Sequence, residues 1–166
     1  MPLENFHVRR ASPSDQQFLW EMLYESLYVP EGGTPFPRSV LTRPEIAKYV
    51  DGWGEEGDVG FVAVDLSVDE PVGAAWLRLF GGDDKGYGYV DGRTPELGIA
   101  VLPEYRGRSV GTELLGRLLE AARDVYEAVS LSVSADNPCV RLYERAGFKQ
   151  VGVCGSSITM VKSLRA

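Results

Sequence analysis

The segment from residue 96 to residue 123 constrains the fold more than any other part of the chain. Glu96–Val101 is a short, largely apolar run that predicts a strand. Residues 110–123 predict an amphipathic helix, whose apolar face is formed by Leu114, Leu115, Leu118, Leu119 and Ala122. A strand that passes through a turn into an amphipathic helix indicates a sheet with a helix packed on one face.

The rest of the chain supplies further strands and helices around this unit. Strands are expected at residues 6–9, 59–65, 72–79 and 129–133, with a closing pair at 148–153 and 157–161. Helices are expected at residues 12–27, 42–50 and 137–146. Residues 81–95 contain many glycines and predict a long loop. The order predicts a mixed α/β (α+β) sheet with helices on both faces, in one domain spanning residues 1–166.

Composition limits the class of protein and its partners. The chain has 166 residues, 44% hydrophobic and 25% charged, which is typical of a soluble globular domain. A net charge of −7 argues against nucleic-acid binding, because phosphate contacts need clustered basic side chains. The acidity suits a cationic partner such as an amine, although solubility is the more common reason for such a charge.

Cysteine and histidine usage narrows the chemistry. Cys139 and Cys154 have neither metal-ligand nor redox spacing, and His7 is the only histidine, so no metal site is expected. The N-terminus lacks the layout of a secretory signal, and no apolar run is long enough to span a bilayer. We therefore expect a cytoplasmic protein with reduced thiols and no membrane partner.

The turn between the central strand and its helix has the composition of an anion site. A helix N-terminus presents unpaired N–H groups and partial positive charge. Gly107 and Gly111 allow close approach, while Arg106 and Arg108 concentrate positive charge in an acidic chain. The turn is therefore a candidate diphosphate cradle, and an ordinary surface turn remains the alternative.

The same turn contains a second motif. Gly107-Arg108-Ser109-Val110-Gly111 matches the G-x-S-x-G nucleophile elbow of serine hydrolases. That elbow requires a strand leading directly into the serine and a later histidine, whereas His7 lies far upstream and residues 103–106 separate the strand from Ser109. A serine hydrolase is kept as a remote alternative.

Two motifs carry a family resemblance. Residues 99–115 resemble the [QR]-x-x-G-x-[GA] signature of the GNAT superfamily of N-acetyltransferases, with Arg106 in the first position and Gly111 in the last. Ser109 stands where the family has its middle glycine. Residues 137–148 are similar to the family's N-x-x-[AV]-x-x-L-Y-x-x-x-G-F segment. The element order extends the resemblance over nearly the whole chain, although the N-terminal half matches by pattern only.

The resemblance implies a mostly antiparallel sheet of about six to seven strands and use of acetyl-CoA as co-substrate. It implies acetyl transfer to a primary amine of a small molecule or peptide by direct attack. The implied cofactor-binding residues are the strand residues Ile99, Ala100 and Val101, the cradle residues Arg106, Gly107, Arg108, Ser109, Val110, Gly111 and Thr112, and Asn137. A catalytically inactive acyl-CoA-binding module of the same fold is the principal alternative, and relatives of this fold are frequently homodimers.

Two side chains are candidate catalytic groups. Tyr143 matches the position of the family's usual proton donor to the leaving thiolate, and its alternative role is a core aromatic. Glu96 is the candidate general base, directly or through water, because an ammonium must lose a proton before it attacks. Its alternative role is a solvated carboxylate at a strand end, and Asp136 and Glu104 are weaker candidates.

The acceptor site is expected in the N-terminal half. Tyr24, Tyr28, Phe36 and Trp53 are candidate lining residues, although core packing could explain each of them. The loop at residues 81–95 is the candidate lid. The sequence leaves open the acceptor and the choice between acetyl and longer acyl donors.

Overall fold

The computed structural model describes residues 5–165 and contains one seven-stranded sheet with the strand order β1-β2-β3-β4-β5-β7-β6. The strands are β1 (Phe6–Arg10), β2 (Val59–Asp65), β3 (Glu70–Arg78), β4 (Glu96–Val101), β5 (Ala128–Ser134), β6 (Lys149–Cys154) and β7 (Ser157–Ser163). The helices are α1 (Gln16–Ser26), α2 (Pro44–Ala47), α3 (Val110–Ala122) and α4 (Cys139–Arg145), with 3₁₀ turns at Pro13–Asp15, Arg38–Thr42 and Pro103–Tyr105.

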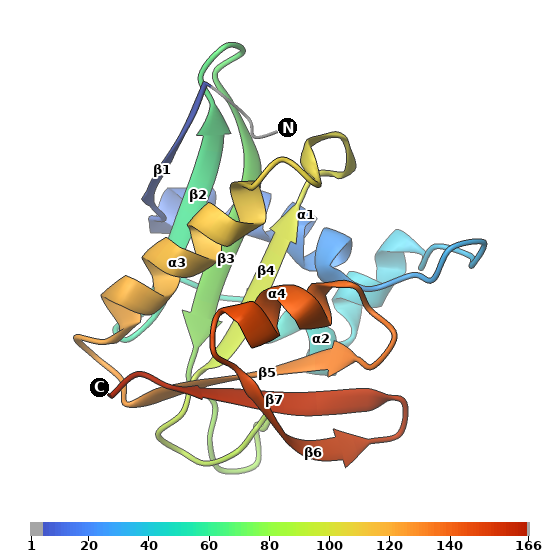
Figure 1. The fold of residues 1–166 in the computed structure, drawn as a ribbon, viewed down its shortest axis with the longest axis vertical. Helices are drawn as coiled ribbons and strands as arrows, with labels where there is room; N and C mark the ends of the chain where they lie inside the picture. The colour runs from blue at the N-terminus through green and yellow to red at the C-terminus, as the bar shows by residue number, and fades with distance from the viewer. Residues whose placement is uncertain (1–4, 166) are drawn as a thin grey trace.

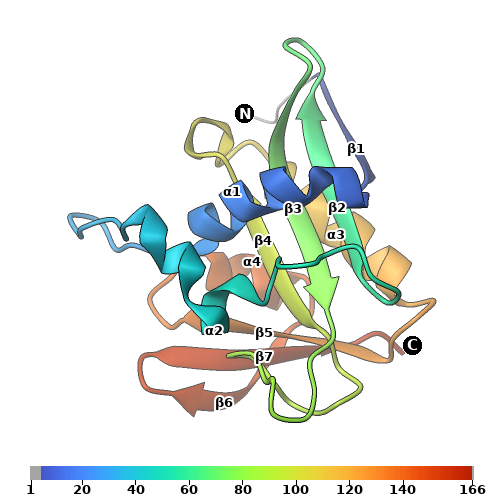
Figure 2. The same cartoon turned by 180° about the vertical axis from the view of Figure 1, so that it is seen from behind.

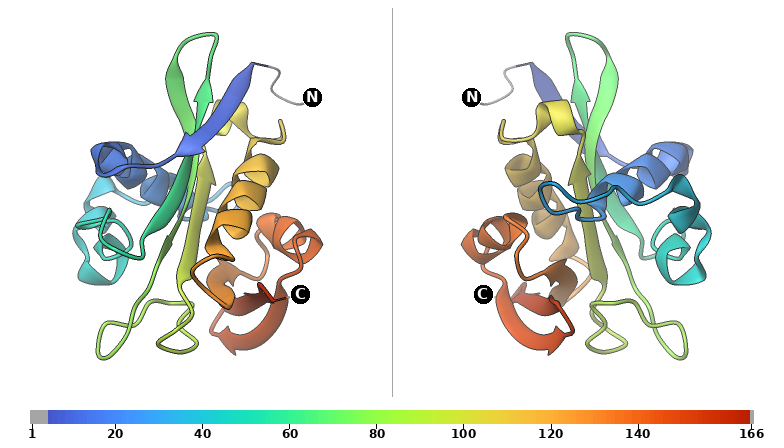
Figure 3. Two further views of the ribbon diagram at one scale, coloured as in Figure 1. Left: turned by 90° about the vertical axis from the view of Figure 1, so that its left-hand side faces the viewer. Right: turned by 90° about the vertical axis from the view of Figure 1, so that its right-hand side faces the viewer.

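The arrangement of layers confirms the predicted fold class. Every neighbouring strand pair is antiparallel except β4 and β5, which are parallel. Helices α1 and α2 cover one face of the sheet, and α3 and α4 cover the other (Figures 1 to 3). The mixed, mostly antiparallel sheet with helices on both faces is therefore as expected.

The main local difference concerns the helix expected at residues 42–50. The α-helix there covers only Pro44–Ala47 and follows a 3₁₀ turn at Arg38–Thr42. Pro44 occupies the first turn, where its missing N–H costs nothing. Beyond Ala47, backbone hydrogen bonds of the 3₁₀ type appear, in which an N–H bonds the carbonyl three residues earlier, as in Tyr49 N–H to Ile46 O at 3.2 Å. Gly52 then adopts a left-handed φ of 70°.

Two apolar clusters hold the sheet from its two faces. The apolar face of α3 is buried against β2 and β3, as its spacing predicted. On the opposite face, Leu19 and Met22 of α1 pack with Trp53 and Trp76. Gly98 allows the Trp76 ring to pack directly against β4, because a Cβ at Gly98 would lie 2.7 Å from Trp76 Cζ2. The position of β4 is thus set by close packing in the core.

Strands β4 and β5 pair at one end only. Glu96 and Ser130 form the only register pair between them, and Ser130 N–H donates to Pro95 O at 3.0 Å. Beyond that point the strands diverge, so that β4 leads toward α3 and β5 leads toward α4 (Figure 1). The divergence opens a wedge in the middle of the sheet.

Candidate active site

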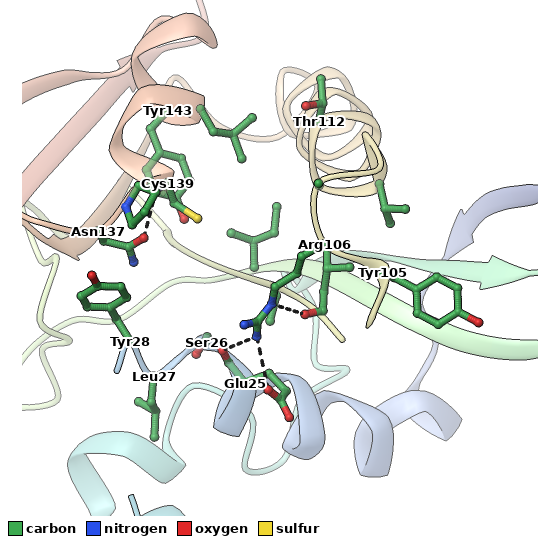
Figure 4. Close-up of a pocket in the computed structure, with 18 of the residues that line it drawn as sticks. Glu25, Ser26, Leu27, Tyr28, Tyr105, Arg106, Thr112, Asn137, Cys139 and Tyr143 are labelled. Carbon is green, nitrogen blue, oxygen red and sulfur yellow. Dashed lines mark hydrogen bonds and ion pairs between the residues drawn. The ribbon is translucent and has the colours of Figure 1, made fainter. Parts of the chain in front are cut away.

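A cavity of about 750 Å³ lies at the open end of this wedge. Four elements meet around it: the end of β4, the turn before α3, the start of α4, and the connector that follows α1 (Figure 4). The cavity is lined by most of the predicted cofactor residues, namely Ile99, Ala100, Val101, Arg106, Gly107, Ser109, Val110, Gly111, Thr112 and Asn137. Sequence reasoning therefore identified one contiguous site from segments far apart in the chain.

The edge of β4 offers backbone hydrogen-bonding groups to the cavity. The backbone groups of successive residues in a strand point alternately to its two sides. Pro95 O points toward β5, where it accepts a bond from Ser130 N–H, so the N–H and C=O groups of residues 97, 99 and 101 point to that side as well. Val101 O fits this alternation, since it accepts a bond from Arg106 Nε at 2.9 Å. The groups of Ile99 face the wedge, where the described part of β5 has already diverged. An extended polar ligand could pair with them.

The turn before α3 has the shape of an anion cradle. Gly107 has a φ of 73°, and a Cβ there would meet nothing within 4 Å, so the approach is open. Ser109, at the N-cap of α3, has a φ of 68° in the left-handed region that glycine normally occupies. Serine therefore adopts here a backbone conformation that glycine takes at a lower energetic cost. The first N–H groups of the thirteen-residue α3 have no intrahelical partner and face this cradle.

The side chains of Arg106 and Arg108 interact with other side chains of the protein. Arg106 Nη2 lies 3.2 Å from Glu25 Oε1, which ties the turn to the end of α1. Arg108 lies over the Tyr105 ring at 5.3 Å and does not line the cavity. Tyr105 Oη in turn donates to Asp65 Oδ2 at 2.7 Å, and the bonds from Ser67 and Tyr105 lower the pKa of Asp65. The predicted role of Arg108 as a cationic side chain in the cavity is therefore wrong, and only its backbone is part of the cradle turn.

Two other cations line the cavity that sequence reasoning had not selected. Arg141 and Arg145 lie one turn apart on α4 and face the cavity from the side opposite β4. Their i, i+4 spacing within the second motif was the available signal. Asn137 Oδ1 accepts a bond from Cys139 N–H at 2.9 Å and so fixes the entry to α4 beside them.

Tyr143 is a packed aromatic residue that also borders the cavity. The residue is only 7% exposed, and its ring packs edge-on against Phe148 with centroids 5.9 Å apart. Its side chain also lines the cavity, beside Cys139 (Figure 4). Burial raises the pKa of the Tyr143 phenol, and nearby Cys139 raises it further. The phenol is therefore held protonated and can act as a donor toward the cavity.

Glu96 occupies a different environment at the closed end of the wedge. The residue is 2% exposed and is not among the cavity-lining residues. Oε1 accepts bonds from Tyr49 Oη at 2.7 Å and Gly88 N–H at 2.8 Å. Burial raises the pKa of this carboxyl above its ordinary value. The expectation of a solvated strand-end carboxylate is wrong, and a direct contact with a ligand in the cavity has no support.

The weaker base candidates lie outside the cavity as well. Asp136 and Glu104 are both exposed, and neither lines the cavity. Asp136 contributes through its backbone instead, since its carbonyl accepts a bond from Tyr28 Oη at 3.3 Å. That bond joins the connector after α1 to the connector before α4.

The predicted acceptor residues divide into two groups. Tyr24, Tyr28 and Phe36 line the cavity, and Tyr24 Oη donates to Phe36 O at 2.5 Å. Trp53 was assigned wrongly, because it is 4% exposed and packs in the core over Gly60, whose added Cβ would lie 2.8 Å from Trp53 Cζ2. An aromatic residue between two glycines has no periodicity that would assign it to the core or to a site.

The loop at residues 81–95 is not a lid on this cavity, because none of its residues lines it. Its glycines serve close packing at the closed end of the wedge. A Cβ at Gly88 would lie 2.8 Å from the carbonyl carbon of Leu131, and one at Gly86 would lie 2.2 Å from Glu96 Oε2. The glycines that predicted a long loop here allow it to pack tightly against β4 and β5.

Comparison with known proteins decides the family. The sequence model of the acetyltransferase (GNAT) family matches residues 19–148, which is most of the chain. The chain belongs to the GNAT family. It is 45% identical over 58 residues to an N-alpha-acetyltransferase of Sulfurisphaera tokodaii, a match that covers 33% of this chain and 35% of that protein. The chain thus spans about a third of the length of this curated relative.

Solved structures support the GNAT fold over the full chain. The PaiA N-acetyltransferase of Thermoplasma acidophilum, in complex with coenzyme A, has a TM-score of 0.65 at 18% identity, covering 96% of this chain and 99% of that one. The ribosomal-protein-alanine N-acetyltransferase of Brucella melitensis has a TM-score of 0.65 at 20% identity, covering 95% and 99%. At these identities the likeness shows the fold alone.

Features of the competing hypotheses are not found at the GNAT site. His7 lies on the edge strand β1 and does not line the cavity, so Ser109 has no imidazole beside it for a hydrolase mechanism. Within residues 5–165, no group of three or more His, Cys, Asp or Glu side chains could hold a metal ion. None of the helices in that part of the chain is long and apolar enough to cross a membrane.

Proposed function

We propose that the chain transfers an acetyl group from acetyl-CoA to a primary amine of a small molecule or peptide, by direct attack of the amine. One observation carries the proposal. The free edge of β4, the left-handed turn before α3 and the buried phenol of Tyr143 all face one cavity. A strand edge, an anion cradle and a proton donor are what a long diphosphate thioester and its leaving thiolate require.

The chain's residues fit the co-substrate along its length. When bound, acetyl-CoA supplies the activated acyl group as a thioester. The groups of Ile99 would pair with the amides of an extended arm, and the N–H groups at the start of α3 would receive the diphosphate. Arg141 and Arg145 supply positive charge from α4, since Arg106 is engaged by Glu25. The proposed cofactor-binding set therefore gains two residues.

Tyr143 is the proposed proton donor. Its raised pKa keeps the phenol protonated at neutral pH, and its place in the cavity wall directs the hydroxyl to the ligand. Donation of a proton or hydrogen bond to a departing thiolate would stabilise the negative charge that develops on sulfur.

Glu96 is the proposed general base, acting through water. A carboxylate whose pKa is raised by burial is better matched to removing a proton near neutral pH than an exposed one. Tyr49 and Gly88 fix Oε1, while Oε2 has no hydrogen-bond partner in the described residues. Oε2 is thus the carboxylate atom left to accept a proton relayed from the amine.

The acceptor end of the cavity is aromatic and includes an acid. Tyr24, Tyr28 and Phe36 supply apolar and cation-attracting ring faces, whereas the Glu25 carboxylate beside them is paired with Arg106. These groups favour a cationic amine. The relative from S. tokodaii is described as an N-alpha-acetyltransferase, which makes a peptide with a free α-amine one acceptor to test first.

The test is a thiol-release assay with acetyl-CoA and a panel of amines. The panel should contain amino acids, polyamines, aminoglycosides and short peptides with a free or blocked N-terminus. We expect CoA release with at least one amine and none with its N-blocked analogue. Calorimetry with acetyl-CoA separates the inactive-module alternative, which binds without turnover, from a protein that does not use acetyl-CoA, which shows neither and would overturn the proposal.

A further inference from the structure

Cys139 places a thiol in the wall of the cavity proposed for the thioester. The residue is exposed at the start of α4 and lines the cavity, whereas Cys154 is exposed at the end of β6 and does not. Cys139 and Tyr143 are four residues apart on one helical face, so their side chains are neighbours (Figure 4). Burial raises the pKa of the Tyr143 phenol, and the Cys139 thiol raises it further.

A second observation indicates that a ligand reaches this point. The Tyr143 side chain is 7% exposed and faces the cavity, and its hydroxyl makes no hydrogen bond within residues 5–165. The hydroxyl is not among the fully buried unpaired polar atoms of the described residues, so it is open to the cavity, where a ligand atom can supply its hydrogen-bond partner. In the proposed function that atom is the CoA sulfur, which would bring the sulfur beside Cys139 as well.

We propose that Cys139 is a modification site that forms a mixed disulfide with coenzyme A when the protein meets CoA in its disulfide form. The inference rests on the proposed function, because it needs CoA to bind in this cavity. The Cys139 thiolate attacks one sulfur of CoA disulfide, and that S–S bond breaks as the Cys139–CoA disulfide forms. The second CoA departs as a thiolate and takes up a proton. No other oxidant is required, and a dithiol reductant reverses the step.

The mixed disulfide would block acetyl transfer. A CoA molecule held covalently at Cys139 occupies the same strand edge and cradle as acetyl-CoA. The rate of formation should rise with pH through the neutral range, because burial raises the pKa of the Cys139 thiol while Arg106 lowers it by a smaller amount. Binding of the CoA portion compensates for the low thiolate fraction by holding the two sulfurs together.

The test treats the whole protein with CoA disulfide and reads intact mass and peptide mass without reductant. We expect one CoA adduct, on Cys139, in the wild type and in Cys154→Ser, and none in Cys139→Ser. CoA disulfide should react about tenfold or more faster than glutathione disulfide, since only the former is positioned by the cavity. A non-transferable thioether analogue of acetyl-CoA should prevent the adduct. Dithiothreitol should remove it.

Activity provides the second readout. Each variant's thiol-release rate after treatment is compared with the same variant's untreated rate, so any basal effect of Cys139→Ser cancels. We expect loss in proportion to the adduct in the wild type and in Cys154→Ser, recovery with dithiothreitol, and no loss in Cys139→Ser.

Three results would overturn the inference: equal modification of both cysteines, equal rates with glutathione disulfide, or no adduct. Calorimetry with CoA distinguishes this failure from failure of the proposed function. If CoA binds and Cys139 stays unmodified, only the proposal of a mixed disulfide at Cys139 is refuted. If CoA does not bind and acetyl-CoA is not turned over, both fall.

Discussion

The two ends of the six-residue strand β4 serve different purposes. At the Glu96 end the strand is paired with β5, buried, and hydrogen-bonded by Tyr49 and Gly88. At the Val101 end it has left β5, and its backbone groups face a cavity. The loss of strand pairing, more than any one side chain, therefore creates the site.

Removing the phenol hydroxyl at the open end should have the largest effect. Tyr143→Phe is expected to lower kcat for acetyl transfer about 100-fold, because general-acid catalysis of this kind contributes about that much or more. The KM for acetyl-CoA should change little, since the ring keeps its packing against Phe148. Initial rates of thiol release measure both quantities.

Tyr126→Phe is the matched control for this prediction. Its hydroxyl donates to Gly57 O at 2.7 Å and lies outside the cavity. Wild-type kcat in Tyr126→Phe and a large loss in Tyr143→Phe would support the assignment. An unchanged kcat for acetyl transfer in Tyr143→Phe would show that the reaction does not need this proton donor.

At the closed end, Glu96→Gln should lower kcat about tenfold, which is a modest effect for a base acting through water. Because burial raises the pKa of Glu96, the deficit should be largest above that pKa, where the wild-type carboxylate can accept a proton. The pH profile of kcat/KM measures this. A profile identical to that of the wild type would assign Glu96 a purely structural role.

The same variant tests stability at the closed end. A carboxyl with a raised pKa in the folded state holds its proton when the unfolded chain has lost it, so the free energy of unfolding falls as pH rises above the ordinary value of 4.5. Glu96→Gln cannot ionise and should avoid this loss, so its free energy of unfolding should rise relative to that of the wild type as the pH increases from 4 to 8. Urea unfolding at several pH values checks the sign. A constant difference between the two proteins would contradict it.

The smallest effect is expected at the cradle turn. Ser109→Gly should increase the free energy of unfolding by about 0.5 to 1 kcal/mol, because glycine relieves the left-handed φ of 68° but loses more chain entropy on folding. Affinity for acetyl-CoA should be retained. Ser109→Ala, which removes the hydroxyl and keeps the strain, is the control. Stabilisation by alanine to the same extent would contradict the backbone explanation.

The sequence was most informative where one pattern determined both structure and chemistry. The apolar face of α3 and the motif around Gly107 predicted the strand, the turn, the helix and the cavity wall together. The pairing of Tyr28 with Asp136 could not be predicted, since no local rule links residues that far apart. The side-chain direction of Arg108 was missed for the same reason, as it depends on Tyr105 and Asp65.

Glycine was the residue type most easily misinterpreted. In the segment 81–95 it predicted a long loop that could act as a lid, whereas Gly86 and Gly88 allow close contact with Glu96 and Leu131. At Gly107 the same residue type does provide an open approach, with nothing near its absent Cβ. Composition cannot separate these two uses, because both depend on what lies opposite the glycine in space.

The close packing of Trp76 against Gly98 has a consequence for the thermodynamics of ligand binding. The indole is fully buried and lies against β4 at the middle of the strand. The strand edge that faces the cavity is therefore ordered when the chain folds, and its conformational entropy is lost at that stage. A ligand meets a recognition surface that is already formed, so its own ordering should dominate the entropy of association.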